Sequence, residues 1–296
     1  MIEILLSVLT QLGLYALLAL SLSLIFGASR VVNLATGDFA AVGAYAMVAT
    51  QGLPFALRIV VSLVAAAPVL FLIERGLLSR LLAHPLASML VTWGVGMALR
   101  QACEVIWGST ARSVAAPVEG SIEILGTVYP TYRLIAALVG VGVTAVVLVL
   151  CYRTRAGLRL RAVAENPTMS ALLGTNPARA RSIAFIVAGM LAMLAGALYS
   201  PLLGVSPSMG FSLLIPSFFA LLLARPGSFA GAAGAAVVIV TLQVLLRQYF
   251  PDTTAEALFY GMVLIAVAIR SIPITRRFQS WLVRIAPSRK PRKLAA

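Results

Sequence analysis

Long uncharged apolar runs alternate with short polar segments along this chain. The run from Ile4 to Phe26 holds 23 residues without a charge, which is enough for a helix to cross a hydrocarbon core of about 30 Å. Lipid offers no partner to backbone N–H and C=O groups, so a segment that crosses it must pair them internally. These runs also lack the alternation of a membrane strand. The pattern therefore predicts an all-α integral membrane protein.

The apolar runs predict a polytopic bundle of eight or nine membrane helices in a single domain, residues 1–296. The expected segments are Glu3–Phe26, Asn33–Thr50, Pro54–Ile73, Leu86–Gly108, Arg133–Tyr152, Ser182–Leu203, Gly227–Leu246 and Ala255–Ile269. A ninth stretch, Met209–Ala224, fits either a full span or a segment that enters the membrane only partway. The first run is interpreted as a retained helix, because an acidic residue precedes it and it is too long for a signal peptide.

Composition and charge support this class and set its orientation. The chain is 61% hydrophobic, with a mean hydropathy of +1.00 and a net charge of +14. Most of the 23 basic residues fall on one side of the predicted topology and most acids on the other. By the positive-inside rule, the N-terminus is expected outside and the C-terminus in the cytoplasm, without any role for nucleic acid. The basic tail, 271–296, is expected to lie along anionic membrane lipid.

Two polar segments are long enough to form structure outside the membrane. The external one, 109–132, contains a predicted hairpin over Val118–Pro130. The other, 153–181, has six arginines and one glutamate, so it is expected in the cytoplasm.

A short helix is predicted inside the cytoplasmic segment, over Thr168–Leu173. Asn166 is a favoured helix cap, Pro167 suits a first turn, and Gly174 can end the helix. Met169, Leu172 and Leu173 would share one side. An apolar face in water needs a groove to fill, which indicates a partner protein. The alternative is a helix that lies on the membrane surface.

Three ionisable residues of the apolar segments are candidates for a role in transport. Asp38 follows Asn33, Thr36 and Gly37; it would either line a pathway or cap a helix. Arg100 and Glu104, at positions i and i+4, are predicted to pair with each other. That couple is either structural or lines a path for a zwitterionic solute.

Two further patterns concern packing. Gly37–Ala40 resembles Gly227–Ala230, which fits either an internal repeat or a general small-residue packing face. Cys103 and Cys151 are expected on opposite faces of the membrane, and therefore unpaired.

Motifs for catalysis are missing from the sequence. It contains no GxSxG, no HExxH and no GxxxxGK[ST] pattern, and its one histidine, His84, has no acidic cluster beside it. The chain is therefore expected to be no enzyme and to bind neither a metal nor ATP itself.

Three blocks of sequence carry a resemblance to a known family. They are Ser29–Ala46, Ile73–Gly108 and Arg153–Arg181. Together they resemble the membrane permease of branched-chain amino acid ABC importers, the LivH-type family. The chain departs from that family at Thr36 (usually histidine), Asp38 (usually glutamate), the turn at 224–228 and the segment 270–273.

The resemblance implies a transport subunit that binds no cofactor, because partner subunits use the ATP. Its partners would be two cytoplasmic ABC ATPases, a second permease subunit (LivM-like or a second copy) and an external solute-binding protein, in the bacterial inner membrane. The implied cargo is a branched-chain or other small amino acid, with urea or short amides as an alternative. An ion-coupled secondary transporter and a membrane-embedded enzyme are alternatives of other classes.

The resemblance and the residue patterns together give two sets of candidate residues. The coupling set, expected to contact the ATPase, is Arg161, Glu165, Asn166, Met169, Leu172, Leu173, Gly174 and Asn176. The pathway set is Asn33, Thr36, Gly37, Asp38, Arg100 and Glu104.

Overall fold

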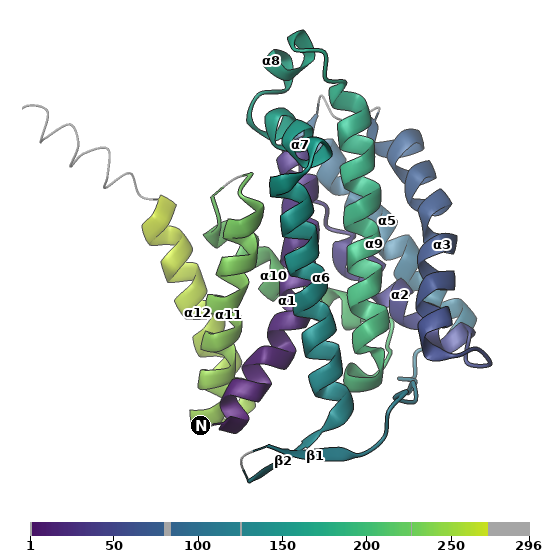
Figure 1. Ribbon diagram of the computed structural model, residues 1–296, viewed down its shortest axis with the longest axis vertical. Helices are drawn as coiled ribbons and strands as arrows, with labels where there is room; N and C mark the ends of the chain where they lie inside the picture. Colours follow the sequence, from purple (N-terminus) through teal and green to yellow (C-terminus); the bar gives the residue numbers. More distant parts are fainter. Residues whose placement is uncertain (1, 80–83, 125, 226, 272–296) are drawn as a thin grey trace, which may run out of the picture.

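The computed structural model describes residues 2–79, 84–124, 126–225 and 227–271, and these form a helical bundle (Figure 1). The expected basic tail lies almost wholly outside the described residues. The helices are α1 (Ile2–Ser29), α2 (Thr36–Ala49), α3 (Phe55–Ile73), the π-helical η1 (Glu74–Leu78), α5 (Pro85–Trp107), α6 (Thr131–Arg153), α7 (Arg155–Glu165), α8 (Pro167–Leu172), α9 (Pro177–Leu203), α10 (Met209–Leu223), α11 (Phe229–Tyr249) and α12 (Asp252–Ser271). The predicted all-α class is confirmed.

Helix length and hydropathy separate the candidate membrane spans from the shorter helices. Within the described residues, six helices are long and apolar enough to cross a membrane: α1, α3 with η1, α6, α9, α11 and α12. Helix α5 has 23 residues and carries Arg100 and Glu104. Helices α2 and α10 have 14 and 15 residues, so each is about 21 to 23 Å long and cannot span a bilayer alone. The segment at Met209–Ala224 is therefore a partial one, and so is Asn33–Thr50.

Helix α1 lies at the middle of the bundle and packs against α6, α9, α10 and α11. Its central residues are almost fully buried, among them Leu17, Leu20 and Leu22. By contrast, α3, α5 and α12 expose many large apolar side chains, including Val64, Leu90 and Leu264. Exposed apolar faces on peripheral helices are what contact with lipid requires.

The two polar segments lie at opposite ends of the bundle (Figure 1). Strands β1 (Ser121–Ile124) and β2 (Thr127–Pro130) form an antiparallel hairpin at the end that holds the N-terminus, so the predicted hairpin is confirmed. Helices α7 and α8 lie at the other end, as does the last turn of α12. This arrangement is the one that the predicted topology requires.

Helix α7 was not expected from the sequence. Most of its surface is charged, and only a narrow side formed by Gly157, Val163 and Ala164 is buried. The Thr154 side chain caps the helix by accepting a hydrogen bond from the Gly157 N–H. Helix α9 begins at Pro177 instead of Ser182, because Asn176 caps it there. Cys103 and Cys151 are buried and unpaired, as expected.

Candidate functional site

The two short helices begin at the same place inside the bundle. Residues 30–35 follow α1 and lead into α2, while residues 204–208 follow α9 and lead into α10. The first turns of α2 and α10 pack backbone to backbone at Gly37 and Gly210. A Cβ on Gly210 would lie 2.6 Å from the Gly37 carbonyl oxygen, and a Cβ on Gly37 would overlap the Gly210 carbonyl. Only glycine permits this approach.

The sequence alone offered a different pair of segments, as either an internal repeat or a general small-residue packing face. It matched Gly37–Ala40 to Gly227–Ala230, but the latter begins α11, where Ser228 caps the helix by accepting from the Gly231 N–H. The segment that meets the start of α2 is instead the start of α10. Two interrupted segments that meet within the membrane are typical of transporters, in which such breaks surround the pathway.

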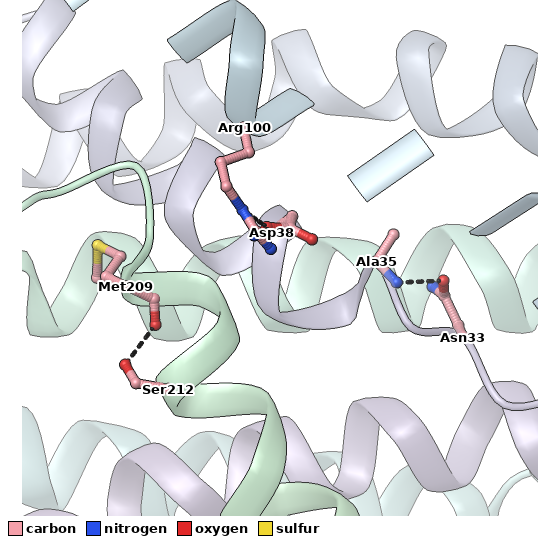
Figure 2. A network of polar contacts seen from close by, with 6 residues as sticks. All are labelled: Asn33, Ala35, Asp38, Arg100, Met209 and Ser212. Atoms are coloured by element: carbon pink, nitrogen blue, oxygen red, sulfur yellow. Dashed lines mark hydrogen bonds and ion pairs between the residues drawn. The ribbon is translucent and has the colours of Figure 1, made fainter. Parts of the chain in front are cut away.

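An ion pair lies beside this meeting point. Arg100 on α5 donates to Asp38 Oδ1 through Nε at 3.2 Å and through Nη2 at 2.9 Å (Figure 2). The Asp38 side chain is 5% exposed and that of Arg100 is 28% exposed. Gly96, one turn before Arg100, makes room for the carboxylate, since a Cβ there would overlap Asp38 Oδ2. The pair neutralises the aspartate, which would otherwise be a costly lone charge at this depth.

This geometry corrects two expectations. The predicted pair of Arg100 with Glu104 is wrong, because Arg100 reaches across to Asp38 on α2, 62 residues away in sequence. The i and i+4 spacing places Glu104 on the same face of α5, but without Arg100 the buried carboxylate of Asp38 would be an uncompensated charge, which is far more costly than leaving the partly exposed Glu104 unpaired. Asp38 also does not cap α2: the helix has no side-chain cap, and Asp38 is two residues past its first residue.

The turn before α2 is held by its own polar groups. Asn33 Oδ1 accepts from the Ala35 N–H at 3.1 Å, and Thr36 Oγ1 donates to the Asn33 carbonyl at 2.8 Å (Figure 2 shows the first of these). Thr92 Oγ1 on α5 accepts from the Leu34 N–H at 3.2 Å. Asn33 Nδ2 is buried and has no hydrogen-bond partner among the described residues. The turn is therefore fixed by its own side chains and by Thr92 of α5, and the Asn33 side-chain NH2 group is left as a buried donor.

A cavity of about 470 Å³ lies next to the ion pair. Arg100 lines it together with the start of α10 and the residues before it; the other lining residues are Leu203, Gly204, Ser206, Ser208, Met209, Phe211, Ser212 and Leu213. The Arg100 guanidinium carbon lies 5.9 Å from the centre of the Phe211 ring. The cavity thus combines a cation, serine hydroxyls and the positive end of a helix with an apolar wall.

The tight approach of α2 and α10 gives a first prediction. Gly37→Ala should destabilise the protein by about 1–3 kcal/mol or more, because the added methyl group must separate two backbones. Gly94→Ala on α5 is the matched control, since a Cβ there meets nothing within 4 Å and alanine favours the helix. Thermal stability in detergent measures both. Equal stability of the two variants would contradict the close packing.

Helix α8 is exposed at the end of the bundle opposite the hairpin. Asn166 Oδ1 accepts from the Met169 N–H at 3.0 Å, and Gly174 has a φ of 82°, so the expected cap and stop are confirmed. The Thr175 N–H bonds to the Ser170 carbonyl at 3.0 Å, which closes a Schellman motif. Ser170 faces inward and is 3% exposed, whereas Leu172 is 78% exposed.

The apolar side of α8 is formed by the three residues expected from the sequence. Met169 is 55% exposed and Leu173 is 79% exposed, beside Leu172. Most of the surface of these three side chains is therefore left uncovered by the described part of the chain. Such a patch is suited to a groove on another protein.

Three other coupling candidates lie in α7 or at the start of α9, the helices that flank α8 in sequence. Arg161 donates to the Cys151 carbonyl through Nε at 3.1 Å and stacks on the Tyr152 ring, with 4.7 Å from guanidinium carbon to ring centre. It therefore ties α7 to the last turn of α6. Asn176 caps α9, and Glu165 is exposed at the end of α7.

Arg30 is a residue that the sequence reasoning missed. It follows α1 with a φ of 59°, the one positive φ of a non-glycine residue in the described ranges. Its guanidinium donates to the Ala164 carbonyl at the end of α7. The two residues are 134 positions apart, so no local pattern could have indicated the contact.

Comparison with known proteins places the chain in a family. Residues 4–268 match the family described as branched-chain amino acid transport system / permease component. A probable branched-chain amino acid transport permease protein LivH from Methanocaldococcus jannaschii is 29% identical over 85% of this chain and 83% of its own length. No solved structure matches the chain.

Two bacterial relatives extend the match. The permease protein BraD of the high-affinity branched-chain amino acid transport system of Pseudomonas aeruginosa is 23% identical, over 89% of this chain and 92% of its own length. The corresponding LivH protein of Escherichia coli is 23% identical over 89% of this chain and 91% of its own length. The family match covers nearly the whole of this chain, and the chain folds as a bundle with helices long enough to cross a membrane. This chain therefore belongs to the branched-chain amino acid transport permeases.

Proposed function

We propose that the chain is one permease subunit of an ATP-driven importer for branched-chain or other small amino acids. The observation that carries the proposal is α8, a capped helix whose apolar side stands exposed at one end of a membrane bundle. The names of the relatives, which are permeases of branched-chain amino acid transport systems, support the choice of cargo. The chain itself would carry out no chemistry on the cargo.

The partners follow from which surfaces are exposed. Two cytoplasmic ABC ATPases would supply the groove for α8, on the end that the arginines of 153–181 assign to the cytoplasm. The hairpin end would then face a solute-binding protein outside the inner membrane. A second permease subunit, LivM-like or a second copy, would complete the pathway.

A connected route leads from α8 to the proposed pathway. Helix α8 continues from α7, whose end accepts the hydrogen bond from Arg30. Residues 31–35 then lead directly into α2, where Asp38 pairs with Arg100 beside the cavity. A movement of α8 caused by closure of the ATPases would therefore pull on the start of α2. The pathway role of Asn33, Thr36, Gly37, Asp38, Arg100 and Glu104 belongs to this proposal.

The cavity next to Arg100 suits brief contact with a zwitterionic solute. Arg100 and the start of α10 are both attractive to a carboxylate, whereas the Phe211 ring and Met209 can contact an apolar side chain. Asp38 already neutralises Arg100, so the attraction is moderate. A weak site is what a pathway needs, because a tight one would retain the solute.

Co-purification tests the proposal. The tagged chain, expressed in its own organism and solubilised in mild detergent, should bring down an ABC ATPase that mass spectrometry identifies by its GxxxxGK[ST] peptide. The same preparation should hydrolyse ATP faster when a loaded solute-binding protein is added. Recovery of the chain without any such ATPase, under conditions that preserve known ABC transporters, would contradict it.

The route through Arg30 gives a second prediction. Arg30→Gly should keep stability within about 1 kcal/mol, because relief of the left-handed backbone offsets the lost hydrogen bond. Stimulation of ATP hydrolysis by the loaded binding protein should nevertheless fall several-fold, since α7 is no longer tied to the start of α2. Arg153→Ala, an exposed arginine at the same end, is the control. Unchanged stimulation in Arg30→Gly would contradict the route.

A further inference from the structure

A second cavity, of about 480 Å³, lies between α6, α7 and α9, away from the meeting point of α2 and α10. In Figure 1, α6 and α9 run side by side, and α7 crosses the end of α6 below α8. Leu24 of α1 also lines this cavity. The cavity therefore sits where membrane-spanning helices give way to the polar segment that carries α8.

The cavity has two chemically different parts. The apolar part follows the membrane-spanning helices and is lined by Leu24, Val147, Leu150, Ile183 and Val187. The polar part lies at the level of α7 and the start of α9 and is lined by Thr154, Arg159, Thr175, Asn176 and Arg179. An amphipathic occupant, with one apolar end and one polar end, fits this division.

The polar part is positively charged and unpaired. No acidic residue lines the cavity, and neither the Arg159 nor the Arg179 guanidinium makes an ion pair or a hydrogen bond within the described residues. Arg161 differs, since backbone carbonyls and Tyr152 already engage it. Basic pockets between membrane helices, at the level of the headgroups, are suited to anionic lipids.

We propose that this cavity is a binding site for one anionic phospholipid. The phosphate lies between Arg159 and Arg179, and the upper part of an acyl chain lies along Leu150, Ile183 and Val187. Charge complementarity selects a lipid over a soluble protein partner. The apolar part is also beside the spanning stretches of α6 and α9, where a cytoplasmic ATPase cannot reach. This site is independent of the proposed cargo.

The position of the site gives the lipid a structural task. Gly174, Thr175 and Asn176, which join α8 to α9, line the same cavity as the two arginines. A bound phosphate would hold Arg159 on α7 and Arg179 on α9 together. It would thereby set the position of the α8 helix relative to the bundle.

Native mass spectrometry of the purified chain, with phosphatidylglycerol as the probe, tests the site. Each arginine near an anionic headgroup contributes about a fivefold change in affinity, so Arg159→Ala with Arg179→Ala should weaken retention of phosphatidylglycerol about 30-fold. Arg153→Ala with Arg155→Ala, two exposed arginines that do not line the cavity, should retain it like the original chain. Phosphatidylcholine should bind weakly to all three.

A second variant separates lipid from other occupants. Leu150→Trp fills the apolar part without changing charge, and it should also reduce phosphatidylglycerol retention. Excess inorganic phosphate should not displace the lipid. Equal retention by all variants, displacement by free phosphate, or equally tight phosphatidylcholine would overturn the proposal. So would efficient disulfide cross-linking of two copies through Ile183→Cys, which would make the cavity an interface between copies.

Discussion

Leu172→Glu is expected to remove the ATPase from this chain while leaving the chain folded in the membrane. Leu172 is 78% exposed on α8, so the change should alter the stability of the isolated chain by no more than about 0.5 kcal/mol. In the complex, the same side chain would be buried in an apolar groove. A buried glutamate without a partner there should cost at least about 2 kcal/mol, which is about 30-fold in affinity.

The control for this prediction lies on the same helix. Ala171 is exposed and points away from the side formed by Met169, Leu172 and Leu173, at 100° per residue. Ala171→Glu adds an identical charge and should retain most of the ATPase in a pull-down. Loss of the ATPase in both variants would indicate a general effect of charge. Retention in both would remove α8 from the interface, and would favour the alternative of a helix lying on the membrane surface.

Arg100→Ala is expected to be the most destabilising single change at the proposed pathway. It leaves Asp38 as a buried carboxylate without its cation, a loss of about 3–5 kcal/mol. Asp38→Asn should cost much less, because its amide oxygen can still accept from Arg100, whose side chain is partly exposed. The double variant Asp38→Asn with Arg100→Gln should recover much of the stability lost in Arg100→Ala.

Thermal unfolding in detergent measures stability, and uptake measures function, so the two roles of the pair can be separated. Asp38→Asn should reach normal abundance in the membrane yet transport poorly, because the charge balance of the cavity is changed. Normal uptake by Asp38→Asn would make the pair purely structural. If Asp38→Asn lowered the thermal stability as much as Arg100→Ala, the loss in Arg100→Ala could not be attributed to an unpaired Asp38 carboxylate.

Features that depend on neighbouring residues could be predicted from the sequence. Asn166, Pro167 and Gly174 determine where α8 starts and stops, because caps act on the first and last turns of their own helix. Uncharged runs of bilayer length are likewise local. The hairpin at Ser121–Pro130 follows the same rule, since its two strands are adjacent in sequence.

Features that depend on distant residues could not be predicted. Arg100 pairs with Asp38 because α5 packs closely on α2 at Gly96. The sequence spacing instead indicated Glu104, which is near Arg100 in sequence but is not its partner. In the same way, the approach of Gly37 to Gly210 joins positions with no shared motif. The charged residues of α7 resembled a loop because only one narrow side of the helix is buried. Tertiary packing decides all three.

The most direct measurement is uptake of radiolabelled leucine into proteoliposomes that contain this chain, the proposed second permease subunit (LivM-like or a second copy) and the proposed ATPases. With the solute-binding protein on the outside and ATP inside, uptake should proceed. It should stop when the Walker A lysine of the ATPase is replaced, or when α8 carries Leu172→Glu. Uptake by the chain without any ATPase, driven by a proton or sodium gradient, would contradict an ATP-driven importer and would make the protein a secondary transporter.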